Sequence, residues 1–155
     1  MKIIFLDFDG VLNSERYIRN YMGGSVIMLD PLCMTLMRDV VKASGAKIVL
    51  TTSWRTHWSK NENEINEIGK EINDIFGKYG LEVFDKTPHM GYNQREQEIE
   101  TWLFEHPDVQ NFVVFDDKTL ESDIIEGHFV KTAGFFGGIC EHDVREAFTI
   151  LGVSY

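Results

Sequence analysis

Short apolar runs alternate with amphipathic segments along the chain. Residues 2–8, 47–50 and 111–115 are three largely apolar runs of strand length. Runs of this kind are typical of strands buried on both faces of a parallel sheet. Residues 81–84 and 128–130 are shorter runs that fit further strands. The pattern therefore predicts three clear strands and two short ones.

Helical spacing appears between these runs. Asp30 followed by Pro31 is a helix start, an N-cap with proline at the first helical position, and Gly45 ends the helix. The isoleucines within residues 65–76 form a second apolar stripe, with Gly80 as its expected C-cap. Both segments are predicted to pack one face against the sheet.

Two further helices complete the pattern. Asn93 with Glu96 three residues later is a capping pair that predicts a helix start, and residues 144–151 predict a last helix closed by Gly152. Strands that alternate with helices imply right-handed crossovers, so we expect an α/β fold with a parallel, doubly wound sheet. Because no repeat or Pro/Gly-rich linker divides the chain, residues 1–155 are predicted to form one domain.

The composition narrows the functional classes. The chain has 155 residues, and 25 Asp and Glu against 15 Lys and Arg give a formal net charge of -10. Because 43% of the residues are hydrophobic, a disordered acidic tail is excluded. The acidity counts against a broad basic surface for non-specific nucleic-acid binding, but it leaves room for a small local basic site.

The location expected from the sequence is cytoplasmic. The start, MKIIFLDFDG, carries an acid in its first apolar run and is typical of a strand instead of a signal peptide. The sequence contains no stretch of about 18 apolar residues, so no membrane contact is expected. Cys33 and Cys140 have no metal-type spacing and fit reduced thiols, although a disulfide between them is also compatible with the sequence.

Three of the predicted strands end in polar residues. Asp7 follows the first, Thr52 and Ser53 follow the second, and Asp116 and Asp117 follow the third. In an open α/β sheet the carboxyl ends of the strands form the ligand crevice, so these side chains should converge. A single Asp after a strand is most simply a loop cap, but three such strand ends together indicate a site.

The acids suit two kinds of chemistry. Asp7 and Asp9 are two residues apart, and carboxylates that share a site push their pKa values apart, which suits a nucleophile beside a general acid. The same spacing also occurs in metal-binding glycosyltransferases and in simple turns. Asp116 and Asp117 repel each other unless a cation neutralises them, and Mg2+ with oxygen ligands fits Asp7 plus one or both of these groups. A solvated turn is the alternative for this pair.

The substrate end of such a site needs donors for a phosphate. The hydroxyls of Thr52 and Ser53 lie at a strand-to-helix junction, where they suit phosphate oxygens. Arg95, near the start of a predicted helix, suits a forked contact to phosphate. Lys86, in the preceding loop, is a rival for the same role.

Together these segments resemble the haloacid dehalogenase (HAD) superfamily of phosphotransferases. LDFDGVLN is similar to the first motif of that superfamily, TTS to the second, Arg95 to the third and FDD to the fourth. The stretches DFDGVLN, TTSWR, REQEIETWL and VVFDD are similar to the small HAD domain found with Swiss-army-knife RNA repair proteins. The resemblance covers most of the chain and implies a Rossmann-like three-layer sandwich around a mainly parallel sheet.

The resemblance also implies a Mg2+-dependent phosphatase that works through an aspartyl-phosphate. On this basis Asp7 attacks phosphorus, while Asp9 protonates the leaving oxygen and then deprotonates the hydrolytic water. Mg2+ is held by Asp7, the main-chain carbonyl of Asp9, Asp116 and Asp117. Asp9 at the general-acid position favours turnover over stable phosphorylation.

The same resemblance assigns the phosphate contacts. Thr52 or Ser53 binds the transferring phosphoryl group, and Arg95 stabilises its charge. The third motif of the superfamily is more often a lysine, so Lys86 stays an alternative to Arg95 at this point.

Cap domains, which select substrates in many HAD enzymes, have little room here. Residues 13–28 are a short loop, and the stretch between the second and third motifs is mostly one helix and one short strand. Within that stretch Trp54 and Arg55 fit either a pocket wall or core packing with a surface arginine. We therefore expect no sizeable cap domain and an open site.

An open site suits a bulky phosphorylated substrate, such as a nucleic-acid end or a phosphoprotein. A small-metabolite or nucleotide phosphatase with the same mechanism is one alternative. A non-hydrolytic phosphoacceptor or binding module is another, because receiver domains also gather acids, a Thr and a cation at the edge of a sheet.

Overall fold

The computed structural model describes residues 1–154, and its centre is a five-stranded sheet with the strand order β3-β2-β1-β4-β5. Every neighbouring pair of strands is parallel. The strands are β1 Lys2–Leu6, β2 Lys47–Leu50, β3 Val83–Lys86, β4 Asn111–Asp116 and β5 Phe129–Lys131. The predicted α/β class with a parallel sheet is confirmed, and the five apolar runs supply the five strands.

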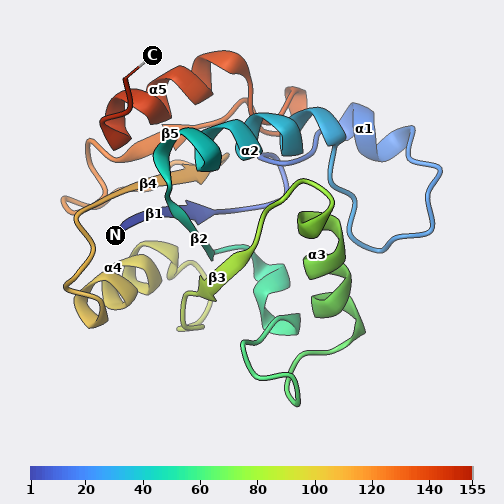
Figure 1. Ribbon diagram of the computed structural model, residues 1–155, viewed down its shortest axis with the longest axis horizontal. Coiled ribbons are helices and arrows are strands. Elements are labelled where there is room, and N and C mark those ends of the chain that lie inside the picture. Colours follow the sequence, from blue (N-terminus) through green and yellow to red (C-terminus); the bar gives the residue numbers. More distant parts are fainter. Residues whose placement is uncertain (155) are drawn as a thin grey trace.

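Helices cover both faces of this sheet, as Figure 1 shows. They are α1 Glu15–Arg19, α2 Pro31–Ser44, α3 Glu67–Gly77, α4 Arg95–Glu105 and α5 Glu141–Leu151, with two 3-10 helices, η1 Ser53–His57 and η2 Gly134–Phe136. Buried side chains of α2, α3 and α5 share one apolar cluster, whereas those of α4 pack in a second cluster with alternate residues of β1 and β4. In Figure 1, α2 and α5 lie together on the upper side and α4 lies on the lower side. The result is the expected Rossmann-like three-layer sandwich.

Local cap chemistry sets several of the helix ends. The Asp30 carboxylate accepts a hydrogen bond (2.9 Å) from a main-chain N–H of the first turn of α2, and Gly45 ends this helix with a φ of 68°, both as predicted. The predicted cap at Asn93 is wrong, because α4 begins only at Arg95 and Gln94 occupies the N-cap position without a side-chain bond. Asn93 instead has a φ of 56° in the preceding turn, a conformation that asparagine tolerates better than most residues.

The carboxyl end of α3 differs from the prediction, whereas that of α5 agrees with it. α3 ends at Gly77 with Lys78 as its C-cap, so the predicted cap at Gly80 falls two residues too late. Gly80 belongs to the turn that follows, where its N–H donates to the Gly77 carbonyl (3.1 Å). Gly152 closes α5 as predicted.

The described part of the chain has no cap domain. Between β1 and α2 it forms only the five-residue α1 and its loop, at the right-hand edge of Figure 1. Between β2 and β3 it forms η1 and α3, and α3 packs Ile72 and Phe76 into the core. The carboxyl edge of the sheet is therefore not covered by a second domain, as predicted.

Two further expectations concern the chain as a whole. None of the described helices is long and apolar enough to cross a membrane. Cys33 is buried, Cys140 is exposed, and both thiols are free. The disulfide that the sequence allowed is therefore not formed.

The parallel register brings three polar residues into one row at the carboxyl edge of the sheet. Leu6, the last residue of β1, pairs with residues of both β2 and β4. The residues that follow these pairs, Asp7, Thr51 and Asp116, therefore lie side by side. The main chain continues the pairing, because the Thr51 N–H donates to the Leu6 carbonyl (3.0 Å) and the Asp7 N–H donates to a carbonyl of β4 (3.2 Å). The strand order changes direction between β1 and β4, because β2 and β3 lie on one side of this pair and β5 lies on the other. Open α/β sheets bind ligands in the crevice at such a change of direction.

Candidate active site

Asp7 lies in the middle of this row, directly after β1, and is only 6% exposed. Its Oδ1 accepts a hydrogen bond from the Phe8 N–H (2.9 Å), and its Oδ2 lies 3.1 Å from Nη1 of Arg95. Burial raises the pKa of the Asp7 carboxyl to about 6; Arg95 lowers this pKa, while the nearby acid Asp116 raises it further. The neighbouring guanidinium therefore compensates the buried charge only in part.

Asp116 and Asp117 complete an acidic group around Asp7. Asp116, the last residue of β4, is fully buried, and its Oδ1 accepts a hydrogen bond from the Lys118 N–H (2.9 Å). One carboxylate oxygen each of Asp7, Asp116 and Asp117 lies within 4.8 Å of the others. Burial, followed by a hydrogen bond with Asp116, raises the pKa of Asp117. The three strand-end acids thus converge, as the parallel register requires.

Arg95 is the cation that joins this group. Its Nη1 lies 2.7 Å from Oδ2 of Asp116 and 3.1 Å from Oδ2 of Asp7. Burial acts to lower the pKa of Arg95, but the two carboxylates outweigh it and raise that pKa, so the guanidinium stays charged. Lys86, the rival cation, instead donates from Nζ to the carbonyls of Arg55 (3.2 Å) and Trp58 (2.5 Å). Of the two candidates, the structure brings only Arg95 to the acids.

The charges at this point do not balance. Three carboxylates and one guanidinium leave a formal charge of −2. Burial is the largest cause of the raised pKa values of Asp7 and Asp117, and the neighbouring Asp116 raises both further. A hard divalent cation with oxygen ligands would neutralise the excess negative charge, so the chemistry of the donor set fits Mg2+.

Asp9 lies outside the group of three carboxylates. Its Oδ1 accepts a hydrogen bond from Nδ2 of Asn13 (3.1 Å), and its Oδ2 accepts one from Nε1 of Trp54 (3.2 Å). Asp9 is half-buried, and these two donors hold its carboxylate.

The hydroxyl residues after β2 have different environments. Thr52 is fully buried, and its Oγ1 accepts a hydrogen bond from the Trp54 N–H (3.3 Å) as the N-cap of η1. Ser53 is exposed. Thr51, which sequence analysis passed over, is fully buried in the row beside Asp7, and its Oγ1 has no hydrogen-bond partner among residues 1–154. The register of β2 against β1 was the signal that would have identified Thr51.

Of the two interpretations that the sequence left open for Arg55, the structure supports the pocket wall, because Arg55 lines the cavity that opens beside Arg95. Arg55 is 4% exposed and forms a 2.8 Å ion pair with Glu98 of α4, so it is not a surface arginine. Its guanidinium also donates to the carbonyls of Thr51 (3.1 Å), Thr52 (3.0 Å) and Thr87 (3.1 Å). Arg55 therefore holds the end of β2, the loop after β3 and the helix of Arg95 in fixed relative positions.

A cavity of about 440 Å3 opens beside Arg95. Its lining includes Ser53, His89, Tyr92 and Lys118, which come from the segments after β2, β3 and β4. The Tyr92 side chain is 90% exposed and free to contact a ligand. The cavity thus offers an aromatic face and a cation next to the acidic group.

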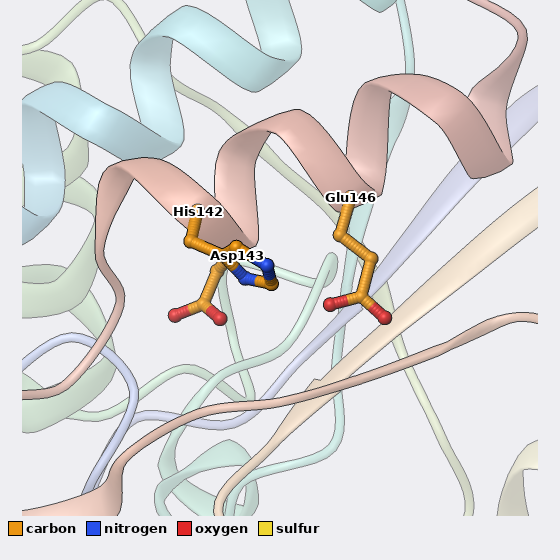
Figure 2. A group of neighbouring side chains, drawn as sticks. All are labelled: His142, Asp143 and Glu146. Atoms are coloured by element: carbon orange, nitrogen blue, oxygen red, sulfur yellow. The ribbon is translucent and has the colours of Figure 1, made fainter.

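A second group of metal-ligand side chains lies on the first turns of α5, as Figure 2 shows. His142, Asp143 and Glu146 each offer one atom, and these atoms lie within 4.8 Å of one another. Asp143 already has a structural role, because its Oδ2 accepts the Cys140 N–H (2.9 Å) in a capping box. His142 and Glu146 are exposed, as ordinary surface residues are. Only one of these three side chains is buried, whereas two of the three acids at the end of β1 are buried and the third is half-buried.

A family model described as the HAD domain in Swiss Army Knife RNA repair proteins matches residues 3–144. The matched region runs from β1 into the beginning of α5 and includes the acidic group and Arg95. No curated protein and no solved structure matches the chain.

Proposed function

We propose that the chain is a Mg2+-dependent phosphatase acting on phosphate monoesters. It belongs to the family of HAD domains in Swiss Army Knife RNA repair proteins and is thus a HAD-type hydrolase domain. The observation that carries the proposal is the contact of one guanidinium nitrogen of Arg95 with both Asp7 and Asp116 at the end of β1. This contact supports the proposal because phosphoryl transfer needs a cation beside the attacking carboxylate.

The proposed reaction has two steps. A carboxylate oxygen of Asp7 bonds to phosphorus, the bond to the leaving oxygen breaks with its electron pair, and that oxygen takes a proton from Asp9. Asp9 then removes a proton from water, which attacks the phosphorus of the aspartyl-phosphate and releases phosphate and Asp7. Asp9 fits both roles because it is close to Asp7 in the chain but is only half-buried.

Asp7, Asp116 and Asp117 would hold Mg2+, with the main-chain carbonyl of Asp9 as the further proposed ligand. When bound, Mg2+ would neutralise negative charge on the phosphoryl group and on the three carboxylates. Arg95 adds a second positive charge that stabilises the transferring group. Thr52 or Ser53, at the end of β2, would bind the transferring phosphoryl group.

The shape of the site supports a bulky substrate. The carboxyl edge has no cap domain, and the cavity beside Arg95 has room for a leaving group. Tyr92 offers a surface for stacking, and Lys118 offers a positive charge. We propose a phosphorylated nucleic-acid end as the substrate, with small phosphate esters as the alternative. Because the chain carries a net charge of -10, the contact with nucleic acid should be short.

The test is phosphate release with and without Mg2+ from an aryl phosphate, phosphorylated oligonucleotides, nucleotides, sugar phosphates and phosphopeptides. We expect Mg2+-dependent release, fastest from the oligonucleotide ends. Faster release from a small ester would overturn the substrate assignment alone. No Mg2+-dependent release from any of them, with a long-lived phosphorylated protein instead, would show a phosphoacceptor module.

A further inference from the structure

The carboxylate of Asp9 is held at both of its oxygens by side chains from different parts of the chain. Asn13, four residues on, donates from Nδ2 to Oδ1 (3.1 Å). Trp54, which follows β2, donates from its indole Nε1 to Oδ2 (3.2 Å). The orientation of the Asn13 amide is fixed, because its Oδ1 accepts the Gly10 N–H (3.0 Å) and its Nδ2 also donates to the Met28 carbonyl (2.8 Å). Two independent contacts therefore define the direction of the Asp9 carboxylate.

The position of Trp54 is itself fixed by its neighbours. Its main-chain N–H donates to Oγ1 of Thr52 at the start of η1. The guanidinium of the next residue, Arg55, donates to the carbonyls of Thr51 and Thr52 and to the carboxylate of Glu98. The indole thus projects from a rigid turn at the end of β2 toward the loop after β1, across 45 positions of sequence.

Both partners of Asp9 are donors. An indole N–H has no lone pair to offer, and the amide nitrogen of Asn13 likewise only donates. When Asp9 carries a proton, neither partner can accept it. Neither partner therefore competes with a substrate for that proton.

From this geometry we propose that Trp54 is a positioning residue for the proton transfer by Asp9, a role that rests on the proposed phosphatase function. Trp54 touches the acid and not the reacting phosphorus. Its loss should slow the reaction in proportion to how much the leaving oxygen needs a proton. An alkoxide is a poor leaving group and needs the proton, whereas 4-nitrophenolate leaves readily without it.

The test compares kcat/KM for an alkyl phosphate and for 4-nitrophenyl phosphate in the wild type and in Trp54→Phe. This ratio reports the steps up to phosphoryl transfer, so slow hydrolysis of the aspartyl-phosphate does not affect it. Trp102→Phe is the matched control, because its indole Nε1 also donates to a carboxylate, Asp85 (2.9 Å), outside the site. A second Trp54 variant, with a benzothiophene in place of the indole, keeps the shape of the two rings and removes only the N–H.

We expect both Trp54 variants to lower kcat/KM at least about tenfold for the alkyl phosphate, since general acid catalysis is worth roughly 100-fold or more. For the aryl phosphate the loss should be less than about threefold, because its leaving group needs no proton. Trp102→Phe should change both substrates by the same factor. Equal losses on both substrates in the benzothiophene variant, or no loss, would overturn the positioning role while leaving the phosphatase function intact. With Mg2+, a wild type that hydrolyses neither of these substrates nor a phosphorylated oligonucleotide end would overturn the function, and the inference with it.

Discussion

The carboxylate of Asp117 lies directly against Gly10, because a Cβ built on Gly10 would be 2.4 Å from Oδ2 of Asp117. Gly10 also has a φ of 81°, in the left-handed region that favours glycine. The glycine of the DFDG motif is therefore needed twice, for its backbone conformation and for the approach of a strand-end acid. The DFDG segment after β1 and the FDD segment at the end of β4 meet at this contact.

Gly10→Ala should displace Asp117 and weaken Mg2+ binding by roughly tenfold, the scale on which disturbed ligand orientation reduces metal affinity. Titration calorimetry with MgCl2 measures this change. Gly24→Ala is the control, because a Cβ at Gly24 has no atom within 4 Å. Unchanged Mg2+ affinity in Gly10→Ala would contradict the role of Asp117 as a ligand.

Arg95→Ala should lower kcat/KM by roughly 100-fold, because it removes the charge that stabilises the transferring group. Arg95→Lys should recover part of the activity, since it keeps the charge but loses the planar fork. Lys86→Met should retain most of the activity, because Lys86 bonds to the carbonyls of Arg55 and Trp58 instead of the acids. Steady-state kinetics with Mg2+ decide between the two cations, and a larger loss in Lys86→Met would reverse the assignment.

The metal-free protein should lose stability as pH rises toward about 6. Burial raises the pKa of Asp7 to about 6 from its ordinary value of 3.8, so folding favours the protonated form. That contribution is present below the ordinary pKa and is lost as pH rises through about 6. Urea unfolding without metal between pH 4 and pH 7 measures it.

Two comparisons identify the source of this pH dependence. Asp7→Asn should flatten the pH dependence of the free energy of unfolding. Mg2+ should stabilise the wild type more at pH 7 than at pH 5, because a carboxylate that binds the metal must be deprotonated. An equally steep loss of stability in Asp7→Asn would assign the effect to other groups.

Arg55→Met should lower the free energy of unfolding by roughly 3–5 kcal/mol, because it leaves the carboxylate of Glu98 buried without its ion-pair partner. The double variant Arg55→Met with Glu98→Leu should recover part of that loss. Arg38→Met is the control, since its ion pair with Asp39 is exposed and worth about 1 kcal/mol or less. Urea unfolding measures all three, and similar losses in Arg55→Met and Arg38→Met would contradict the buried pair.

Local chemistry explains why much of the fold was predictable. The Asp30 cap and the Gly45 stop each depend only on residues within the adjacent turn of α2. The apolar runs were long enough to mark the strands. The convergence of Asp7, Asp116 and Asp117 followed from the general arrangement of parallel strands. The Asn93 cap failed because asparagine suits both an N-cap and a left-handed turn, and sequence does not distinguish them.

Contacts between distant segments were beyond the sequence. Arg55 looks like any exposed arginine until the loop after β3 and the helix α4 close around it. The bond from Trp54 to Asp9 likewise depends on how η1 faces the loop after β1. Thr51 differs from Thr52 only by one place in the register of β2. Each of these residues acts through packing that only the assembled fold defines.

The most direct test of the central claim is whether Asp7 itself receives the phosphoryl group. Asp9→Asn should accept it from 4-nitrophenyl phosphate, which needs no protonation to leave, and should then lack the base that activates water. Rapid quenching with Mg2+ present, followed by mass spectrometry of the peptide that contains residue 7, measures this. We predict one phosphoryl group on Asp7 in Asp9→Asn and none when Asp7→Asn is added. A phosphoryl group that persists without Asp7, or none at any time while phosphate is released, would contradict the account.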